Sequence, residues 1–449
     1  MSEEKYLYSP RVIDPQSKPH SPASIEDGKN IILGGKEYII VQKLGQGGFG
    51  NVYKCIDSDK KEYAVKKILT REMGSPGIPC LFEAAAMSRF NHPCLNRALM
   101  VEASLNGLYI LEDLGVDLGK MIHGGLRNGS FININQLKNI LYRVGKGISY
   151  LHGMGIVHGD IKSQNILIFG DNDVRLNDFN LTTYVKWSPT KLHLCTSLYR
   201  PLEVWLNKGW NEKMDIWAYG CMMYELIYNK TLIPYQGENP NKSVNKMKYV
   251  NAILDWANFN SHEKVNINKY NIDYSAPHIH SELIRRKANL INTSNDIDDR
   301  EKELYINLML RCLQVSDTSR PSIDTVLSDT LFANIRNNPE YRELNIKYDN
   351  INNQFNKDFY SIIEKEITTY VEKGNRELLR LATNICYKYV TIKKCSTHLI
   401  KRVSVWIAKK LLRTSFLSQD IPNLDKNITK ENFLETELDI CNVLEFKLI

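Results

Sequence analysis

The sequence predicts an α+β fold in which a small β-rich region is followed by a long, mostly helical part. Three observations support this prediction. Short runs rich in β-branched and aromatic residues dominate residues 38–114, and apolar side chains follow a helical spacing over residues 115–335. Residues 356–449 contain no glycine after Gly374 and have the pattern of helices throughout. A chain of 449 residues is long enough for two or three domains.

Composition narrows the class of protein. Apolar residues make up 43% of the chain and charged residues 24%, which is ordinary for a globular protein. No run of 18 apolar residues and no apolar signal-peptide core occur, so we expect an intracellular protein, cytoplasmic or nuclear, without a membrane partner. Nine cysteines without a CxxC pair favour free thiols over disulfides or a zinc site. A net charge of +7 spread over the whole chain favours solvated surfaces over a nucleic-acid patch.

The β-rich region is preceded by a polar stretch dotted with proline, and we expect residues 1–37 to be a disordered tail. The runs "YIIVQKLG", "GNVYKCID" and "KEYAVKKIL" follow, then a helix near Leu81–Phe90, and then "LYILEDL". This order predicts a small, mostly antiparallel sheet with one helix.

The helical part shows two clear patterns. One is the run "DIWAYGCMMYELIY", which is apolar almost all round and therefore predicts a buried helix. Residues 336–355 are polar and predict a linker to the last segment, 356–449. The other pattern is a helical stripe formed by Leu137, Ile140, Leu141, Val144, Ile148 and Leu151.

A glycine-rich turn, a strand lysine and a helix glutamate give the first chemical signal. "LGQGGFGNV" places Gly45, Gly47 and Gly50 between two strands, where a backbone can approach a phosphate closely. Lys66 lies in the next strand, where it could reach a phosphate, and Glu83 lies on a helix from which a carboxylate could pair with it. Each feature alone has an ordinary alternative: a hairpin turn, a solvated lysine and an exposed glutamate.

The combination of motifs is more specific than any one of them. "VHGDIKSQNIL" and "LNDFN" follow the helical stripe, and "LYRPLE", "MDIWAYG" and "DTSRPS" follow in turn. In this order the chain from about residue 38 to 335 resembles a eukaryotic protein kinase. The resemblance implies a bilobal fold, with a small N-lobe over residues 38–114 and a helical C-lobe over residues 115–335. The residues that carry it are Asp160, Lys162, Asn165, Asp178, Glu203, Asp215 and Arg320.

The resemblance implies transfer of the ATP γ-phosphate to serine or threonine of a protein substrate. Asp160 would orient the substrate hydroxyl and accept its proton, and Lys162, two residues later, would reach the γ-phosphate. Lys66 would hold the α- and β-phosphates, and Glu83 would fix Lys66. The remaining implied roles are Mg²⁺ binding by Asn165 and Asp178, a tie from Thr196 to the catalytic loop, and buried structural contacts of Glu203, Asp215 and Arg320.

An adenine pocket is implied as well. Leu111 would close its back, and backbone groups of Glu112 and Leu114 would hydrogen-bond the base. Asp117 would take the ribose hydroxyls. The ring would lie between the side chains of Val52, Ala64 and Leu167, a role that is compatible with plain core packing.

Three positions depart from the family pattern. Asn180 replaces a glycine that often needs an unusual backbone, and asparagine tolerates left-handed geometry best among the other residues, so Asp178 should still reach the metal. Ser163 replaces a proline. Gly159 replaces the arginine that clasps an activation-loop phosphate, so we expect phosphorylation of that loop, at Ser188 or Thr190, not to be the principal switch.

The last hundred residues predict a small helical bundle. Apolar stripes run over 359–371, 378–389 and 399–411, and Thr429 is a plausible N-cap of a fourth helix. "RELLRLATNICYKYV", "LIKRVSVWIAKKL" and "ITKENFLETELDICNVLEFKL" resemble, in this order, helices of one cyclin box. Lys410, or its neighbour Lys409, and Glu437 fall where cyclins keep a lysine and a glutamate for partner contact. An unrelated helical bundle is the open alternative.

The kinase part is itself similar to cyclin-dependent kinases around Glu83 and around residues 108–122. We therefore expect a serine/threonine kinase fused to a single cyclin-like domain that packs on the Glu83 helix in cis. Proline direction is a further expectation, because Arg200 follows Tyr199 as in proline-directed relatives. The alternatives are a pseudokinase scaffold, and a helical domain that recruits a separate kinase or cyclin.

Overall fold

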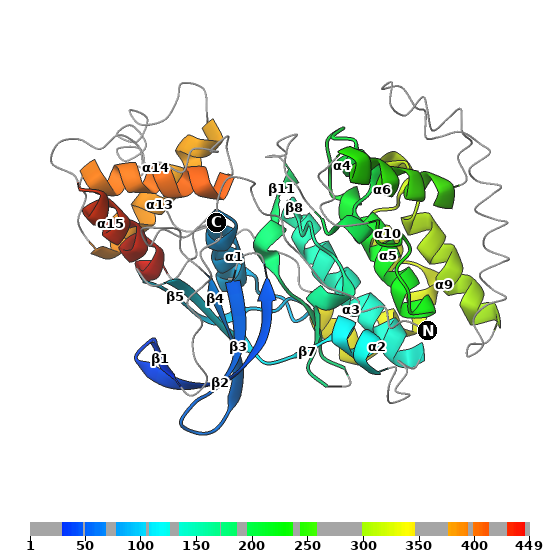
Figure 1. Cartoon of the computed structure of the whole chain (residues 1–449), viewed down its shortest axis with the longest axis horizontal. Helices are drawn as coiled ribbons and strands as arrows, with labels where there is room; N and C mark the ends of the chain where they lie inside the picture. Colours follow the sequence, from blue (N-terminus) through cyan, green and yellow to red (C-terminus); the bar gives the residue numbers. More distant parts are fainter. Residues whose placement is uncertain are drawn as a thin grey trace. The chain divides into compact units, whose positions relative to one another are not determined.

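The computed structural model describes residues 29–47, 50–68, 78–104, 107–125, 134–170, 172–185, 195–236, 243–257, 299–345, 376–393, 398–412 and 429–444. The chain divides into two compact units (Figure 1). Among the described residues, the sheet unit consists of those within 29–91, 96–114 and 376–444, and the helical unit consists of His92–Leu95 and those within 115–345. The C-terminal helices thus belong to the same unit as the large sheet.

The sheet unit is built on a six-stranded antiparallel sheet with the strand order β1-β2-β3-β4-β6-β5. Helix α1 (Ile78–Arg89) contacts β5, and its position agrees with the predicted helix near Leu81–Phe90. The strands are β1 (Asn30–Leu33), β2 (Lys36–Gly47), β3 (Gly50–Ile56), β4 (Glu62–Ile68), β5 (Ala98–Ser104) and β6 (Gly107–Asp113).

The strand register assigns each residue of the sheet to one of two faces. Directly paired residues of antiparallel strands share a face, and successive residues alternate. Lys66 pairs with Val52 and with Ile110, so these side chains share what we call the Lys66 face. Ala64, two residues before Lys66, lies on the same face together with its partner Glu112.

The opposite face carries a hydrophobic cluster. Tyr53 pairs with Val65, and Val65 pairs with Leu111, so all three side chains point away from the Lys66 face. The complete cluster of buried residues is Leu33, Tyr38, Ile40, Tyr53, Cys55, Val65 and Leu111.

Strand β1 lies within the stretch that the sequence predicts as a tail. The β1–β2 hairpin turns at Gly34 and Gly35, which have φ values of 55° and 75°. Leu33 is buried in the hydrophobic cluster, and the Gly34 N–H donates to Glu102 Oε2 at 2.8 Å. The predicted tail is therefore wrong from residue 30 onward, because a short apolar run pairs with β2 and covers the cluster. Residues 1–28 lie outside the described residues.

The C-terminal helices are α13 (Arg376–Lys393), α14 (His398–Leu412) and α15 (Lys430–Val443). They correspond to the second, third and fourth predicted helices, and the first stripe, over 359–371, lies outside the described residues. The Trp406 and Phe433 rings meet edge to face, with centroids 6.3 Å apart, and the Tyr389 hydroxyl donates to Asp439. Thr429 caps α15 as predicted, because its side chain accepts the Asn432 N–H at 3.1 Å.

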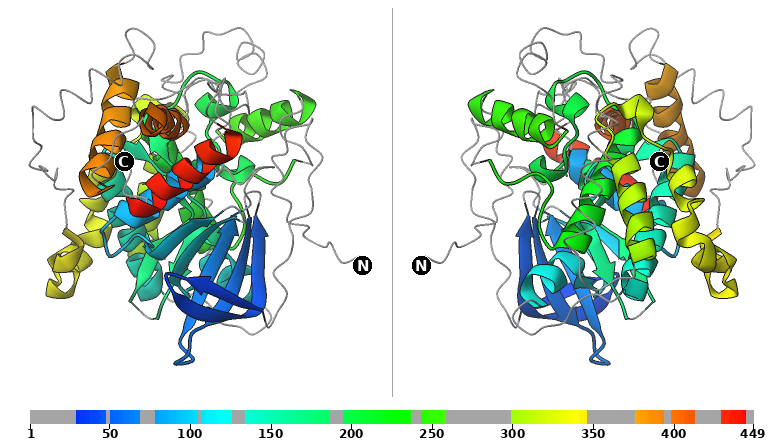
Figure 2. Two further views of the ribbon diagram at one scale, coloured as in Figure 1. Left: turned by 90° about the vertical axis from the view of Figure 1, so that its left-hand side faces the viewer. Right: turned by 90° about the vertical axis from the view of Figure 1, so that its right-hand side faces the viewer.

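These helices pack on the sheet part of their own unit. Helix α14 contacts α1, and α15 contacts β5 (Figures 1 and 2). The Asn442 side chain of α15 hydrogen-bonds the main chain of Ala103: its Oδ1 accepts the N–H at 3.0 Å and its Nδ2 donates to the C=O at 2.9 Å. Because β5 is an edge strand of this sheet, the amide takes the place of a neighbouring strand. We call this pair of hydrogen bonds the Asn442 clip.

The helical unit contains eight named helices in its described part. They are α2 (Leu118–Gly125), α3 (Ile134–Gly153), α4 (Leu202–Trp205), α5 (Lys213–Tyr228), α6 (Ser243–Trp256), α9 (Asp299–Cys312), α10 (Ile323–Leu327) and α11 (Ala333–Asn337). Helix α3 carries the predicted stripe, and α5 is buried at every residue from Met214 to Met223, as its all-round apolar sequence predicts. No helix of the described residues is long and apolar enough to cross a membrane.

Two small sheets hold the loops of this unit. One is three-stranded, with β7 (Val116–Asp117), β9 (Ile166–Ile168) and β10 (Val174–Leu176) in the order β10-β9-β7. The other pairs β8 (Ile156–Val157) with β11 (Thr183–Tyr184). Together they fix the two ends of the segments that carry Asp160 and Asp178.

The predicted linker begins later than the sequence suggests. Residues Pro339–Asn345 form a 3₁₀ segment in which Leu344 is fully buried. The Tyr341 hydroxyl donates to Asn139 on α3 at 3.0 Å, and the Leu344 carbonyl lies 3.2 Å from His92 Nε2. The linker prediction is wrong for residues 336–345, because Tyr341 and Leu344 anchor this polar stretch, and residues 346–355 lie outside the described part.

Candidate active site

Two charged side chains meet on the Lys66 face of the sheet unit. Lys66 Nζ lies 2.5 Å from Glu83 Oε1, and Glu83 is only 1% exposed. Helix α1 carries Glu83, and β4 carries Lys66. Removing either partner would leave the other charge buried, which costs several kcal/mol (about 3–5). The structure thus brings together the lysine and glutamate that the sequence singled out.

The glycine-rich turn is the β2–β3 hairpin. Gly47 and Gly50 form its last pair, and Gly45 pairs with Val52. A Cβ on Gly50 would lie 2.3 Å from the Lys67 carbonyl oxygen, so the approach of β4 requires glycine there whatever binds nearby. At Gly45 a Cβ would meet nothing within 4 Å. The requirement for glycine at position 50 therefore comes at least partly from the sheet itself.

The residues expected around adenine are divided between the two faces. Val52 and Ala64 lie on the Lys66 face, as expected, and Leu114 follows the end of β6. Leu111 lies on the opposite face in the hydrophobic cluster, so the expectation that it closes the back of the pocket is wrong. A one-residue difference in register moves a side chain to the other face, and the side chain on the Lys66 face is Glu112.

Glu112 is buried together with an asparagine that sequence reasoning missed. The side chains are 5% and 0% exposed, and Asn96 Nδ2 donates to Glu112 Oε2 at 2.6 Å. The available signal was a carboxylate directly after an apolar run, in "LYILED". A buried carboxylate needs hydrogen-bond donors, and Asn96 supplies one.

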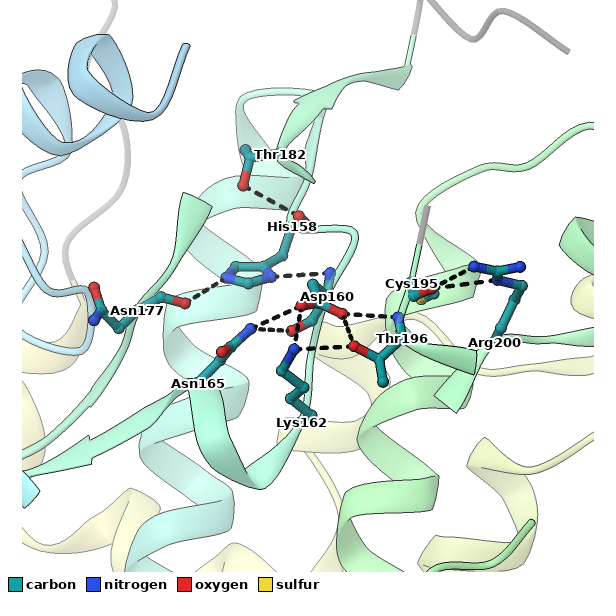
Figure 3. A network of polar contacts seen from close by, with 9 residues as sticks. All are labelled: His158, Asp160, Lys162, Asn165, Asn177, Thr182, Cys195, Thr196 and Arg200. Carbon is teal, nitrogen blue, oxygen red and sulfur yellow. Dashed lines mark hydrogen bonds and ion pairs between the residues drawn. The ribbon is translucent and has the colours of Figure 1, made fainter. Parts of the chain in front are cut away.

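In the helical unit, the segment between β8 and β9 gathers the predicted catalytic side chains (Figure 3). Lys162 Nζ donates to Asp160 Oδ2 at 2.6 Å and to Thr196 Oγ1 at 2.9 Å. The Thr196 N–H and hydroxyl both donate to Asp160 Oδ1, at 2.8 and 2.7 Å. Asn165 Nδ2 donates to Asp160 Oδ2 at 3.1 Å. The sequence predicted this grouping, including the link from Thr196.

The charge of Asp160 follows from these donors. Burial would raise the pKa of the Asp160 carboxyl, but the Lys162 ammonium and the hydrogen bonds from Thr196 outweigh it and hold the pKa below its ordinary value. Asp160 is therefore an anion at neutral pH, oriented by four donors.

A second buried carboxylate fixes the backbone before Asp160. Asp215 on α5 is fully buried and accepts the N–H groups of His158 and Gly159, at 2.8 and 3.0 Å. The His152 ring also lies 3.0 Å from it. These contacts agree with the structural role implied for Asp215, since one side chain satisfies two consecutive backbone donors of the loop.

His158 is buried beneath the same loop as a neutral ring. Its Nδ1 accepts the Asp160 N–H at 3.2 Å, so Nε2 carries the proton and donates to the Asn177 carbonyl at 3.1 Å (Figure 3). Burial lowers the pKa of His158, which agrees with the neutral form. The ring thus ties the segment before Asp160 to the segment before Asp178.

The predicted metal ligands lie on these two tied segments. The Asn177 N–H donates to the Asn165 carbonyl at 2.8 Å, and Asp178 follows directly. Because the Asn165 amide nitrogen donates to Asp160, its amide oxygen is the group left for a cation. An amide oxygen and a carboxylate are hard oxygen donors of the kind Mg²⁺ prefers, so the donor set fits this ion.

The backbone at Asp178 differs from the expectation for Asn180. Asp178 itself is left-handed, with φ of 66°, and a 3₁₀ turn over Phe179–Leu181 follows. Asn180 lies inside this turn and does not adopt a positive φ. The left-handed residue is therefore Asp178, and a short polar side chain such as that of aspartate tolerates this conformation.

Gly159 has a local reason to be glycine. Its φ is 80°, a conformation that any other residue adopts only at a cost of roughly 1 kcal/mol. Its carbonyl accepts the Cys195 N–H at 2.8 Å, so a backbone hydrogen bond holds this end of the activation segment. Ser188 and Thr190 lie outside the described residues, and their role remains a prediction.

The residue that donates this hydrogen bond, Cys195, has an unusual backbone conformation. Cys195 has φ of 67°, and its carbonyl accepts Arg200 Nε at 3.2 Å and Nη2 at 2.8 Å. The Arg200 guanidinium lies over the Trp205 ring, 4.3 Å from its centroid. Arg200 was singled out from the sequence, but Cys195 was not, because no sequence pattern marks its left-handed geometry.

Glu203 and Arg320 form the expected buried ion pair. Arg320 is 2% exposed and donates from Nη1 and Nη2 to the two oxygens of Glu203, at 2.6 and 2.9 Å. It also donates to the carbonyls of Gln314, Lys213 and Val315. These five hydrogen bonds of the Arg320 guanidinium connect Glu203 to the backbone near residues 213 and 314–315.

Asp117 and Leu167 meet in the three-stranded sheet. They are direct partners in the β7–β9 pairing. Asp117 Oδ1 accepts the Lys120 N–H at 3.1 Å, so the side chain caps the start of α2, and burial raises its pKa. The cap is a structural role that the sequence analysis did not assign, and the ribose role remains a prediction.

The two cyclin-like positions have different outcomes. Glu437 lies on α15 and is fully buried. The side chains of Lys410 and Lys409, near the end of α14, lie outside the described part of the structure. Their contact role remains a prediction.

Two buried histidines make stability depend on pH. Burial lowers the pKa of His92 to about 4 and also lowers that of His158, whereas an unfolded histidine titrates near 6.5. Below that value the unfolded chain binds protons that the folded chain does not, so stability falls as pH falls from 7 towards 4. For His92 alone we expect a loss of roughly 2 kcal/mol by pH 5.

Chemical denaturation at pH 7, 6 and 5 measures this loss. His92→Asn keeps an acceptor for the Cys94 N–H but does not titrate, so it should reduce the slope of stability against pH. A wild-type unfolding free energy that stays constant from pH 7 to 5 would contradict the prediction.

The fold and these groups define the class of protein. A strand lysine paired with a helix glutamate, and an aspartate held by a lysine, an asparagine and a threonine, are the parts with which protein kinases position ATP and a hydroxyl. The protein kinase domain family matches residues 38–332. The chain therefore belongs to the protein kinase family.

Two curated relatives are similar to part of the chain. The chain is 30% identical over 197 residues to the serine/threonine-protein kinase Nek1 of Mus musculus, covering 42% of this chain and 16% of that protein. It is 31% identical over 207 residues to a protein of Encephalitozoon cuniculi described as a probable cell division protein kinase, covering 45% of this chain and 65% of that protein. The chain thus spans less than two thirds of the length of these curated relatives.

Proposed function

We propose that the chain is an ATP- and Mg²⁺-dependent kinase that phosphorylates serine or threonine in protein substrates. The observation that carries this proposal is the complete set of contacts around Asp160, made by Lys162, Asn165 and Thr196. The relative from Mus musculus is described as a serine/threonine-protein kinase and the relative from Encephalitozoon cuniculi as a probable protein kinase, which agrees with the proposal. Transfer of labelled phosphate from ATP by the full chain, compared with Asp160→Asn, is the direct test.

The proposed mechanism assigns one task to each group. The Asp160 carboxylate accepts the hydroxyl proton of the substrate while Thr196 and Asn165 fix its orientation. Lys162 shares its ammonium between Asp160 and Thr196 and faces the charge that develops on the transferred phosphate. Lys66, held by Glu83, binds the α- and β-phosphates. Bound Mg²⁺ at Asn165 and Asp178 would neutralise phosphate charge.

We further propose that the C-terminal helical domain activates the kinase in cis. The support comes from α1, in which Ala84, Ala85 and Ala86 are all fully buried. Successive helix residues are 100° apart, so Ala85 lies about 200° around the axis from Glu83, on the side away from Lys66. A helix that only covered a sheet would expose this side. Contact with α14 is a physical reason for its burial, and it would hold Glu83 towards Lys66.

The contact on β5 supports the same proposal. In the Asn442 clip, the side chain of Asn442 on α15 bonds only main-chain atoms of Ala103 on β5. It fixes where α15 lies along the strand, and through the bundle it fixes α14. Covalent linkage adds an effective concentration on the order of millimolar for a short linker. The similarity to one cyclin box and the name of the cell division kinase agree with an activating role.

We also propose that substrates carry proline directly after the phosphorylated residue. A peptide placed beside the activation segment would normally offer its next N–H to a carbonyl there. The Cys195 carbonyl is turned to Arg200 by the left-handed backbone, and two N–H groups of the guanidinium occupy it. An N–H buried without an acceptor costs about 1–3 kcal/mol. Proline has no N–H and loses nothing, so it is favoured at this position.

Arg200→Ala tests proline direction. We expect the wild type to favour a Ser-Pro peptide over the matched Ser-Ala peptide by about 10- to 100-fold in kcat/KM. In the variant the Cys195 carbonyl is released to accept an N–H, so the ratio should fall towards one. The ratio is informative even if overall activity decreases, because both peptides meet the same enzyme.

Arg175→Ala is the matched control, since Arg175 also lies over an aromatic ring, that of Phe169, but pairs with Asp173. It should leave the Ser-Pro to Ser-Ala ratio unchanged. A wild type with no preference for proline, or an unchanged ratio in Arg200→Ala, would reject the proposal.

A further inference from the structure

A buried carboxylate on the Lys66 face has no part in the roles described so far. Glu112 is 5% exposed and follows two positions after Ile110, the direct partner of Lys66. Its own strand partners are Ala64 on β4 and Ala98 on β5. Because both neighbours end at Cβ, the long Glu112 side chain is flanked by two small residues on this face.

The orientation of this carboxylate is held by a second buried side chain. Asn96 is fully buried and donates from Nδ2 to Glu112 Oε2 at 2.6 Å. An amide nitrogen is a donor and a carboxylate is an acceptor, so this hydrogen bond can run only from Asn96 to Glu112. With Oε2 held by Asn96, the group that Glu112 offers to a neighbour is again an acceptor.

The neighbourhood is that expected of the nucleotide base. Ala64 and Val52 lie on this face, and the sequence resemblance assigns both to the adenine ring. The six-position of adenine is an amino group, which donates hydrogen bonds, and that of guanine is a carbonyl, which accepts them. A carboxylate stabilises the first and repels the second.

We infer that Glu112, positioned by Asn96, makes this kinase select adenine over guanine nucleotides. The inference rests on the proposed function, because it concerns the base of the same phosphate donor. An apolar residue at this place would close the pocket and leave the distinction between the two bases to backbone groups alone. Glu112 is a specificity-determining residue, and Asn96 is a positioning residue that acts through it.

Binding of fluorescent mant-ATP and mant-GTP to the full chain tests the inference without requiring transfer. The wild type should bind mant-ATP about 10- to 100-fold more tightly than mant-GTP. In Glu112→Gln, the amide oxygen can accept from Asn96, which turns the amide NH₂ to the base. A donor there favours the guanine carbonyl, so the ratio should fall by about tenfold or more and approach or pass one.

Two further variants separate this role from a structural one. The leucine of Glu112→Leu offers the base neither an acceptor nor a donor. Its ratio of mant-ATP to mant-GTP affinity should therefore lie between those of the wild type and Glu112→Gln. Glu102→Gln makes the same chemical change on β5, but Glu102 pairs with Tyr109 on the opposite face. Its ratio should equal that of the wild type.

The outcomes distinguish this inference from the proposed function. Equal preference for adenine in the wild type and in both Glu112 variants overturns the inference and leaves the kinase proposal intact. Failure of the wild type to bind either nucleotide in the presence of Mg²⁺ overturns the proposed function as well. A ratio that moves in Glu102→Gln as much as in Glu112→Gln also overturns the inference, because the effect would then not depend on the face.

Discussion

Replacing Asp160 by asparagine is expected to lower the rate of phosphate transfer by about 10²- to 10⁴-fold. The carboxylate accepts hydrogen bonds from Lys162, Asn165 and Thr196 and is the only group in this cluster placed to take the hydroxyl proton. Asparagine has the same shape but one acceptor oxygen, and it cannot hold a proton. Nucleotide binding should change little, since the phosphates are assigned to other residues. Steady-state transfer with labelled ATP and binding of a fluorescent nucleotide measure the two effects.

Asp173→Asn is the control for the Asp160 experiment, because Asp173 is half-buried and pairs with Arg175 outside this cluster. It should keep full activity. Equal transfer by the wild type and Asp160→Asn would show that the activity is not that of this site. A wild type that binds ATP with Mg²⁺ but transfers no phosphate would instead support the pseudokinase scaffold.

An arginine in place of Ala85 is expected to lower transfer by about a hundredfold. Ala85 is fully buried on the side of α1 away from Lys66, and a charge introduced there costs several kcal/mol unless the packing opens. Opening it separates α14 from α1, and α1 then loses the support that holds Glu83 near Lys66. A loss of about 3 kcal/mol in this alignment corresponds to about a hundredfold in rate.

Asn442→Ala is a milder variant of the same experiment. It removes the two hydrogen bonds of the Asn442 clip, each worth about 0.5–1.5 kcal/mol, and should lower activity several-fold. The controls are Ser88→Arg, which puts the same charge on a less buried position of α1, and Asn432→Ala, which makes the same truncation at an exposed position of α15. Both should be nearly silent.

Circular dichroism and the thermal unfolding midpoint show whether each variant is folded. If Ala85→Arg and Asn442→Ala fold and keep full activity, activation in cis is wrong. Restoration of activity by adding the inactive Asp160→Asn chain, which keeps its helical domain, would favour action between separate molecules instead.

The cluster around Asp160 could be predicted because its residues are close in sequence. Asp160, Lys162 and Asn165 lie within six residues, so any backbone that forms this loop brings them together. Thr196 is distant in sequence, and only the kinase resemblance linked it to Asp160. The Lys66–Glu83 pair was found in the same way, because the family pattern states which strand and helix meet.

Register was the part of the sheet that the sequence could not supply. Leu111 and Glu112 are neighbours, and a difference of one residue decides which of them faces Lys66. An apolar residue is the ordinary choice for a pocket wall, and this preference favours Leu111 over Glu112 when the sequence alone is considered. Asn96, whose hydrogen bond stabilises the buried Glu112 carboxylate, lies just before β5, whereas Glu112 lies on β6. No local sequence pattern links the two residues.

The remaining differences arise from tertiary contacts of polar segments. Residues 339–345 contain only two apolar anchors, Tyr341 and Leu344, yet they pack on α3 and His92. The β1 hairpin likewise depends on the partner strand β2. Neither segment has enough internal periodicity to predict order, because its stability comes from the surface it covers.

Covering β5 also affects how the protein behaves at high concentration. An edge strand presents unpaired backbone groups, and two such edges on different molecules can join and begin aggregation. Here α15 lies on that edge, and its Asn442 occupies both backbone groups of Ala103. Shortened versions of the chain that end before α15 should therefore be less soluble than the full chain, and light scattering would detect this. The C-terminal helices would then protect the kinase from self-association.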